Sequence, residues 1–434
     1  MDKKTILKEI IADEHEDSKS NLNPRDLELP IDSGMIVVVS GVRRSGKTSL
    51  LKLTRDKLIA NGTPIINTLF LSFDDERLML NTDELDLILQ AYQELYPDVQ
   101  MGECYLFLDE IQNITYWEKF IRRVFDTKTK RIFLSGSNSK QLGSEIATSL
   151  RGRTLRYELY PLSFREYLSF RNTSLNYHAS SNKSKILNNF HRYTHNGGFP
   201  EIVNRKKEES LTILTDYYQV LLFRDIIERY NLSKTYLLKP FIQRMFATLT
   251  KPFSINKIFK ELKSQGLQIS KDNLYEIIEY IESVYLAKRM YKFNYSVLNR
   301  QMSDKKVYCI DNGLLNAITF KFSKDDGKLF ENMIAIWLWS NQNADIFYFK
   351  GKNECDFVLF ERDKPSYCIQ ASFDISTSTT TLQREIKGLT EAMDYFGMDE
   401  GVVLTAEVEQ QMKVNNKWIH IMPAYKTMID NKMI

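Results

Sequence analysis

The sequence predicts an α/β protein that begins with a parallel sheet, and three observations support this. A β-branched apolar run, Met35–Val39, precedes a glycine-containing loop and a stretch of helix-forming residues. A second apolar run, Cys104–Leu108, ends in the adjacent carboxylates Asp109 and Glu110. Strand-like and helix-like segments alternate along this part of the chain, and repeated βα units build parallel sheets.

Composition and length are typical of a globular protein with several domains. The chain has 434 residues, of which 43% are hydrophobic and 26% are charged, and this length predicts two or three domains. The formal net charge of +3 neither demands nor excludes a nucleic acid partner. No apolar run approaches the ~20 residues that span a bilayer, and the charged start leads into no apolar signal core. We therefore expect a cytoplasmic protein with no membrane partner.

The loop after the first apolar run has the pattern of a phosphate-binding loop. Residues 41–48 read Gly-Val-Arg-Arg-Ser-Gly-Lys-Thr, which matches G-x-x-x-x-G-K-[ST] between a strand and a helix. The two glycines permit a close backbone approach to phosphate. Lys47 can reach the outer phosphates of ATP, and the Thr48 hydroxyl can ligate Mg²⁺. The predicted ATP-binding residues are Gly41, Val42, Arg43, Arg44, Ser45, Gly46, Lys47, Thr48 and Ser49.

The carboxylates that follow Cys104–Leu108 match the Walker B pattern. The carboxyl ends of parallel strands meet at the ligand crevice, so Asp109 and Glu110 are expected beside the phosphate loop. Asp109 would hold Mg²⁺ together with Thr48, and Glu110 would polarise the attacking water. The alternative is a solvated strand end, because Asp-Glu pairs are common.

A further strand, Arg131–Gly136, is followed by Ser137 and Asn138. Asn138 is a candidate to touch the γ-phosphate or its attacking water. The alternative is a simple turn built from serine and glycine.

Two arginines, Arg151 and Arg153, flank a glycine just before the strand-like run Thr154–Tyr160. They are far from their own phosphate loop in sequence, which suggests an arginine finger given to a neighbouring subunit. This prediction implies a homo-oligomer. Surface salt bridging is the alternative for each arginine.

A series of motifs extends along nearly the whole chain. They are Gly41–Thr48, Leu108–Gln112, Ser135–Ser139, Arg151–Arg153, Tyr160–Tyr167, Gly197–Glu201, Phe223–Tyr230 and Val307–Gly313. In this order they resemble the prokaryotic AAA-type P-loop ATPases often called archaeal-type ATPases, which carry a C-terminal domain of unknown function. The resemblance implies a P-loop NTPase fold of the AAA type that hydrolyses ATP with Mg²⁺. Its predicted catalytic residues here are Lys47, Asp109, Glu110, Asn138, Arg151 and Arg153.

Three domains are expected: 1–170 for the ATPase domain with an N-terminal arm, 171–300 for a helical lid with a winged helix, and 301–434 for an α/β domain. In the second domain, two helices with apolar stripes begin near Ser254 and Ser270, as in helix-turn-helix folds. Carboxylates on the outer face of the second helix oppose phosphate contacts, which dominate DNA affinity. Double-stranded DNA and a protein therefore stay equal alternatives as the partner.

The order of elements after residue 320 is similar to restriction-endonuclease-like folds, and this resemblance implies a divalent metal site. The matching positions are Glu331, Asp356 and Gln370, with Glu354 nearby. Oxygen ligands of this kind suit hard cations. Ser372 stands where that family has a lysine, and serine supplies no charge to stabilise the reaction. We therefore expect a vestigial metal site in a domain that does not cleave DNA.

The predicted function is Mg²⁺-dependent ATP binding and hydrolysis that moves DNA- or protein-binding C-terminal domains. A second hypothesis treats the nucleotide as a switch ligand with little turnover. A third, an ATP-gated nuclease, requires catalysis at Glu331 and Asp356, which Ser372 argues against.

Overall fold

The computed structural model describes residues 2–16, 22–138, 150–319, 325–341, 344–375 and 379–432. The chain folds into two compact units. The first comprises Met1–Tyr160 and Ser283–Tyr285, and the second comprises Pro161–Glu282 and Leu286–Ile434. Among the described residues, no helix is long and apolar enough to cross a membrane.

The first unit holds a five-stranded parallel sheet in the order β2-β3-β4-β1-β5. Its strands are β1 Ile36–Ser40, β2 Thr68–Ser72, β3 Tyr105–Asp109, β4 Ile132–Gly136 and β5 Thr154–Glu158. Its helices are α1 Lys3–Glu16, α2 Lys47–Ala60, α3 Asp86–Leu95 and α4 Trp117–Thr127. The predicted fold class, an α/β protein that begins with the parallel sheet of a P-loop NTPase, is confirmed.

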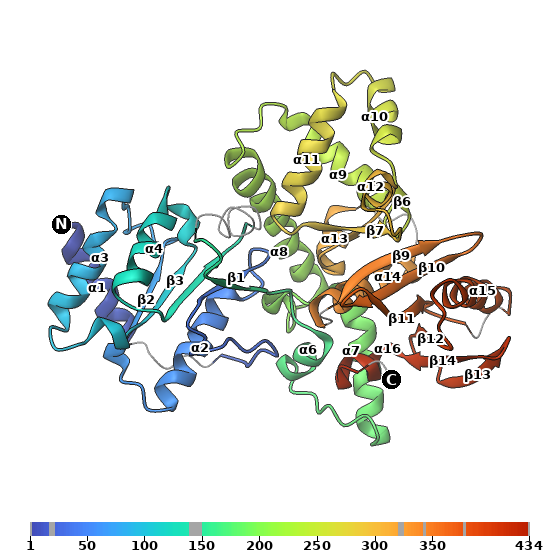
Figure 1. Cartoon of the computed structure of the whole chain (residues 1–434), viewed down its shortest axis with the longest axis horizontal. Helices are drawn as coiled ribbons and strands as arrows, with labels where there is room; N and C mark the ends of the chain where they lie inside the picture. Colours follow the sequence, from blue (N-terminus) through green and yellow to red (C-terminus); the bar gives the residue numbers. More distant parts are fainter. Residues whose placement is uncertain are drawn as a thin grey trace. The chain divides into compact units, whose positions relative to one another are not determined.

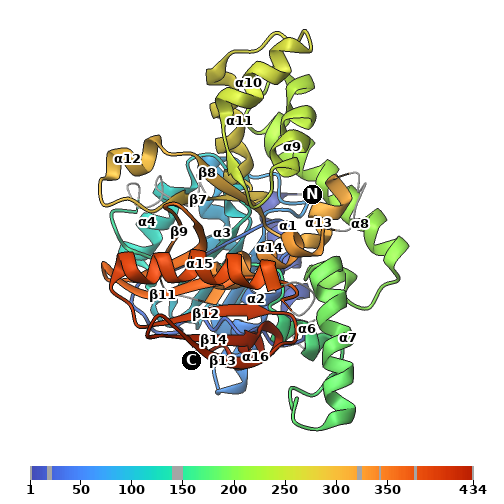
Figure 2. The ribbon, with the colours of Figure 1, turned by 90° about the vertical axis from the view of Figure 1, so that its right-hand side faces the viewer.

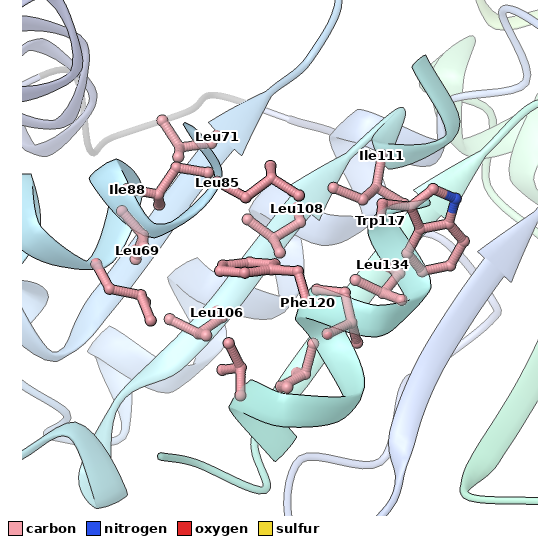
Figure 3. Packing of buried hydrophobic residues seen from close by; sticks show 14 of the residues in the cluster. Leu69, Leu71, Leu85, Ile88, Leu106, Leu108, Ile111, Trp117, Phe120 and Leu134 are labelled. Atoms are coloured by element: carbon pink, nitrogen blue, oxygen red, sulfur yellow. The ribbon is translucent and has the colours of Figure 1, made fainter. Parts of the chain in front are cut away.

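Helices cover both faces of this sheet because the strands are apolar on both sides. Alternate strand residues such as Leu69, Leu106 and Leu134 pack against α1, α3 and α4 (Figure 3). The other face, which includes Val37 and Phe107, packs against α2. All five strands of this parallel sheet therefore end at one edge, and the phosphate loop after β1 and the turn after β3 lie at this edge (β1, β2 and β3 are labelled in Figure 1).

Two element boundaries depend on local interactions. The apolar run Ile65–Phe73 is not one strand, because Ile65–Asn67 forms a 3₁₀ turn and β2 begins at Thr68. Asn81 caps the turn before α3, because its side chain and that of Glu84 form a reciprocal capping box.

The second unit contains a nine-stranded mixed sheet in the order β13-β14-β12-β11-β10-β9-β7-β8-β6. Its strands are β6 Pro252–Phe253, β7 Ala287–Lys292, β8 Lys305–Cys309, β9 Asp345–Lys350, β10 Glu354–Glu361, β11 Lys364–Ala371, β12 Glu400–Thr405, β13 Gln410–Val414 and β14 Lys417–Pro423. Its helices are α6 Phe164–Phe170, α7 Ser180–Asn196, α8 Lys207–Val220, α9 Leu238–Ala247, α10 Ile255–Ser264, α11 Lys271–Ser283, α12 Val297–Met302, α13 Asn312–Ile318, α14 Asp326–Asn341, α15 Thr379–Phe396 and α16 Ala424–Asp430, with a π-helical segment at Leu221–Glu228.

Two apolar clusters hold this sheet between helices. Helix α15 packs on one face through Leu389 and Met393 and contacts β10, β11 and β12; Figure 2 shows it alongside β11 and β12. Helices α14 and α16 join the cluster on the other face, through residues such as Ile334 and Tyr425. The central strands β10 and β12 are buried on both faces for this reason.

In the region of the expected winged helix, the elements follow one another in the order α9, β6, α10, α11, β7, α12 and β8, and β8 pairs antiparallel with both β6 and β7. The winged helix itself stays a prediction. The apolar stripe of α11 is buried through Leu274, Ile277 and Ile281. Strand β7 also pairs in parallel with β9, at Tyr291 opposite Phe347, so one sheet continues from this region into the C-terminal α/β region. The domain boundaries at residues 170 and 300 stay predictions.

Buried hydrogen bonds to the Asp311 carboxylate connect two of the sequence motifs in the second unit. The Asp311 carboxylate accepts hydrogen bonds from the Gly198 and Leu314 backbone N–H groups. A Cβ on Gly313 would lie 1.9 Å from the Asn196 carbonyl oxygen, so only glycine fits there. The motifs Gly197–Glu201 and Val307–Gly313 therefore have a structural role in the second unit.

Candidate functional site

The phosphate loop lies between β1 and α2, as its pattern predicts. Gly46 has φ 97°, a left-handed conformation that favours glycine. A Cβ on Gly41 would lie 2.2 Å from the Leu159 carbonyl oxygen, because the loop begins against the end of β5. The start of α2 at Lys47 faces the loop, where backbone N–H groups favour an anion.

Lys47 is buried inside this loop. Its Nζ donates to the carbonyl oxygens of Gly41 and Val42, at 3.1 and 3.2 Å. The same atom lies 3.5 Å from Glu110 Oε1. The ammonium is thus held by weak, exchangeable contacts at the position from which a lysine reaches the outer phosphates.

Asp109 accepts hydrogen bonds from hydroxyl groups on three different elements. Its Oδ2 accepts from Thr48 Oγ1 at 2.9 Å and from Ser72 Oγ at 3.2 Å. Its Oδ1 accepts from Ser135 Oγ on β4. Burial, followed by the charge of Glu110, raises the pKa of Asp109. The structure therefore brings the two predicted Mg²⁺ ligands, Thr48 and Asp109, into direct contact.

Glu110 lies at the turn after β3 with φ 52°, an uncommon conformation for a non-glycine residue. Its backbone N–H donates to Ser135 Oγ at 3.2 Å, and its Oε2 accepts from Gln112. Burial alone raises the pKa of Glu110, but the Lys47 charge and the Gln112 hydrogen bond outweigh it and lower this pKa. Glu110 is therefore an ionised, buried carboxylate at the loop.

The residues of this site fit Mg²⁺ and the phosphates of ATP. The Thr48 hydroxyl and the Asp109 carboxylate are hard oxygen donors in contact, as Mg²⁺ prefers. Ser45 Oγ, at the turn of the loop, is buried and has no hydrogen-bond partner among the described residues. A buried hydroxyl without a partner suits a ligand that supplies one.

The other predicted loop residues surround this centre. Val42 is buried, Ser49 is half-buried on the first turn of α2, and Arg44 is exposed with φ 69°. Arg43 Nη1 lies 3.4 Å from Asp74 Oδ2. Asn138 is fully buried two residues after β4, whose neighbours in the sheet are β3 and β1, so it lies at the same edge.

Sequence reasoning missed several residues that support the site. Arg25, from the arm before β1, donates to the Ser45 carbonyl oxygen at 2.7 Å and to the Tyr160 carbonyl oxygen at 2.9 Å. Ser72 and Ser135 hold the Asp109 carboxylate. A lone arginine or serine carries no pattern in sequence, although Ser135 does begin one of the motifs noted above.

The two candidate finger arginines lie away from their own phosphate loop. Arg151 and Arg153 precede β5, whose first residue pairs with Ile36 at the start of β1, so they lie at the amino end of the sheet. Arg153 forms an ion pair with Asp126 on α4. Arg151 is exposed and has no ion pair or hydrogen bond with any residue that the structure describes.

The candidate C-terminal metal ligands converge, but they surround a lysine. Lys306 Nζ lies 3.1 Å from Glu331 Oε1, 3.0 Å from Glu354 Oε1 and 3.1 Å from Asp356 Oδ1. Gln370 Oε1 accepts from the Asp356 backbone N–H at 3.2 Å. No group of three or more His, Cys, Asp or Glu within the described ranges could hold a metal ion.

Comparisons with known proteins match two parts of the chain to two different domain families. Residues 33–168 match a family described as an AAA domain, and residues 187–325 match a domain of unknown function, DUF8612. A solved structure of the Aeropyrum pernix ORC1 protein in complex with DNA is similar at a TM-score of 0.29 and 13% identity, covering 73% of this chain and 91% of that one. The Caenorhabditis elegans PCH-2 structure has a TM-score of 0.23 and 15% identity, covering 65% and 67%.

Relatives of the whole chain are uncharacterized proteins. One from Haemophilus influenzae is 27% identical over 88% of this chain and 92% of its own length. The uncharacterized protein MJ1544 of Methanocaldococcus jannaschii is 34% identical over 414 residues, covering 92% of this chain and 88% of the relative. The chain carries an AAA domain on a P-loop-type parallel sheet and belongs to the same family as MJ1544.

Proposed function

We propose that the protein hydrolyses the β–γ bond of ATP with Mg²⁺ and uses the cycle to move its C-terminal domains. The observation that carries this proposal is the contact of four predicted residues at one sheet edge. Thr48 Oγ1 lies 2.9 Å from Asp109 Oδ2, and Lys47 Nζ lies 3.5 Å from Glu110 Oε1. These pairs join the phosphate loop to the end of β3, as hydrolysis requires.

The four side chains take separate roles in this proposal. Thr48 and Asp109 hold Mg²⁺, which supplies charge to neutralise the phosphate oxygens. Lys47 leaves Gly41 O and Val42 O and binds the outer phosphates. Glu110 then loses its ion pair with Lys47, and its carboxylate is released to orient the attacking water and accept its proton.

Two variants of the phosphate site test this proposal. Lys47→Ala removes the cation that meets the outer phosphates, and we expect kcat/KM for ATP to fall at least about 100-fold. Glu110→Gln should retain ATP binding but lower kcat by about 100-fold or more, because the amide cannot accept the proton. The matched control is Lys57→Ala, an exposed lysine on α2 paired with Glu28. Unchanged hydrolysis by the Lys47→Ala protein would sink the assignment.

One observation supports the second candidate, a nucleotide-switched regulator with little turnover. Both Glu110 oxygens are engaged within the chain, one by Lys47 and one by Gln112. If Gln112 keeps its hydrogen bond after ATP binds, water activation is slow. Single-turnover rates for Gln112→Ala distinguish the two candidates: acceleration supports the switch, and no change or a loss supports the ATPase.

The partner that responds to this cycle is proposed to be nucleic acid or protein. Reading of the major groove by α11 is disfavoured because its exposed face carries Asp272, Glu276 and Glu279.

A further inference from the structure

Three residues far along the chain, Ser283–Tyr285, belong to the compact unit that holds the phosphate loop. Their neighbours in sequence belong to the second unit: α11 leads into this segment, and β7 begins at Ala287. All three residues are buried. Any displacement of the segment is therefore carried by covalent bonds into α11 and β7.

The Tyr285 phenol reaches the residue that directly precedes the phosphate loop. It is hydrogen-bonded to the side chain of Ser40, and the charge of Glu158 at the end of β5 acts on it. Tyr160 donates to Glu158 Oε2 at 2.6 Å from the same strand end. Burial, followed by the Glu158 charge, raises the pKa of Tyr285, so the phenol keeps its proton at neutral pH.

The end of β5 holds Ser40 through its backbone and its side chain. The Leu159 N–H donates to the Ser40 carbonyl oxygen at 2.7 Å, and Ser40 Oγ lies 3.5 Å from the Tyr157 carbonyl oxygen. The next residue, Gly41, begins the phosphate loop. The loop therefore starts from a fixed point, and Tyr285 supplies one of the side-chain contacts that fix it.

The backbone of Tyr285 is in a left-handed conformation, with φ 61°. Leu286 N–H donates to Ile281 O at 3.1 Å, so Tyr285 is the left-handed residue of a Schellman cap at the end of α11. Glycine is usual at this position, because a residue with a bulky side chain is strained there. Such strain persists only where the surroundings hold the residue in place, and here the contacts of the buried ring do so.

Leu286 connects this strained residue to two elements of the second unit. Its N–H binds Ile281 of α11, and its carbonyl oxygen accepts from the Ile310 N–H at 3.2 Å. Ile310 is followed by Asp311, whose carboxylate binds the Gly198 N–H. A movement of Tyr285 is thus felt at once by the end of α11 and by the motif that follows β8.

We propose that Tyr285 positions the start of the phosphate loop and that ATP binding acts through it on α11. In the proposed function Lys47 leaves the Gly41 carbonyl oxygen to bind the phosphates, which frees the residue next to Ser40. Ser40 then shifts, and the phenol follows it. The inference rests on the proposed ATP binding and names the residue that carries the cycle to the second unit. Because coupling between two sites is reciprocal, a partner bound at α11 changes the affinity for ATP by the same factor.

The first experiment is a double-mutant cycle on the Kd for ATP, measured calorimetrically with Mg²⁺ in the Glu110→Gln background to prevent hydrolysis. Ser40→Ala and Tyr285→Phe each remove the hydrogen bond, and each should raise Kd about fivefold, the usual effect of one such bond. The double variant should bind no more weakly than either single variant, since both remove the same contact. The matched control is Tyr105→Phe, which removes the hydrogen bond of another buried phenol, to Asp32, and should leave Kd unchanged.

The second experiment follows transmission by hydrogen exchange and mass spectrometry in the same background. ATP should protect residues 41–49 and change the exchange of residues 271–286. Tyr285→Phe should keep the first effect and lose most of the second. Tyr285→Gly suits the left-handed backbone and retains the helix cap, but it lacks the ring, so the second effect should be lost there too.

Three results would overturn the inference. Additive losses of ATP affinity in the double variant would show that Ser40 and Tyr285 do not act through their mutual contact. An unchanged ATP response of residues 271–286 in Tyr285→Phe and Tyr285→Gly would show that another route carries the signal. Protection of residues 41–49 without any response of residues 271–286 would overturn the inference alone, whereas the absence of ATP binding in the Glu110→Gln parent would overturn the proposed function with it.

Discussion

Asp109 and Glu110 are adjacent in the chain, but the pKa of Asp109 is raised and that of Glu110 is lowered, because different groups surround them. Asp109 faces three hydroxyl groups, which suit a buried metal ligand, and burial raises its pKa. Glu110 faces the Lys47 ammonium, and its pKa falls even though it is equally buried. From the dipeptide Asp-Glu alone, either side chain could be the metal ligand or the base. The assignment of metal ligand and base depends on which strand end each side chain meets.

Asp311 provides a test at the residue level that is independent of nucleotide. Burial raises the pKa of this carboxyl to about 6, despite hydrogen bonds from the Gly198 and Leu314 N–H groups. A raised pKa in the folded state favours the protonated form, so this group stabilises the fold at low pH and the gain is lost as pH rises through about 6. We expect the free energy of unfolding of the wild type, relative to Asp311→Asn, to fall by about 2 kcal/mol between pH 4 and pH 7.

Urea unfolding of both proteins at a series of pH values measures this difference. Subtraction of the Asp311→Asn curve removes the contribution of every other titrating group. A difference that is flat with pH, or that rises, would show that Asp311 stays ionised in the folded protein.

At the level of elements, the arm between α1 and β1 completes the phosphate loop. The Arg25 guanidinium donates a hydrogen bond from Nη1 to the Ser45 carbonyl oxygen and another from Nη2 to the Tyr160 carbonyl oxygen. It therefore ties the turn of the loop to the end of the first unit. Charge-assisted bonds of this kind are stronger than neutral ones, so they restrict the loop before ATP arrives.

Arg25→Ala should raise KM for ATP about tenfold while kcat changes little, because the loop must be ordered on binding. Arg25→Lys keeps the charge but loses the two-pronged geometry, and an intermediate KM is expected. Lys57→Ala, which breaks the arm's exposed pair with Glu28, is the control. Initial rates over a range of ATP concentrations decide the matter, and a change confined to kcat would refute the positioning role.

At the level of the whole molecule, the two ends of the parallel sheet carry different candidate functional residues. The carboxyl end carries the phosphate loop, Asp109 and Glu110, whereas Arg151 and Arg153 lie at the amino end. An arginine at the amino end serves a phosphate only in a second copy of the chain. We propose Arg151 for this role because Arg153 already pairs with Asp126.

Arg151→Ala should retain ATP binding but lose turnover by about 1,000-fold, the usual effect of an arginine finger. Arg153→Ala should lower the turnover rate less than Arg151→Ala does. A mixture of Arg151→Ala and Lys47→Ala proteins should regain activity, since one copy supplies the finger and the other the intact loop. Light scattering with ATP must show an oligomer; a fully active monomer would exclude the finger.

The accuracy of the sequence predictions follows the range of the interactions that they require. The loop Gly41–Thr48 and the strand before Asp109 are contiguous patterns, and the structure places them as expected. Strand β13 was not expected, because Gln410–Val414 is a polar edge strand with no apolar pattern. The charged face of α11 was foreseen, since helical periodicity fixes which residues share a face.

The sequence by itself determined the α/β class, the phosphate loop, its two carboxylates and the absence of a lysine at residue 372. Each depends on neighbours within a few residues of the chain, where backbone geometry is local. Only the tertiary structure decided which cations meet those groups. Arg25 reaches Tyr160 across 135 positions, and Lys306 reaches Asp356 across 50, through pairing of strands that no local pattern specifies. A buried charge requires a partner, and the fold selects that partner from anywhere along the chain.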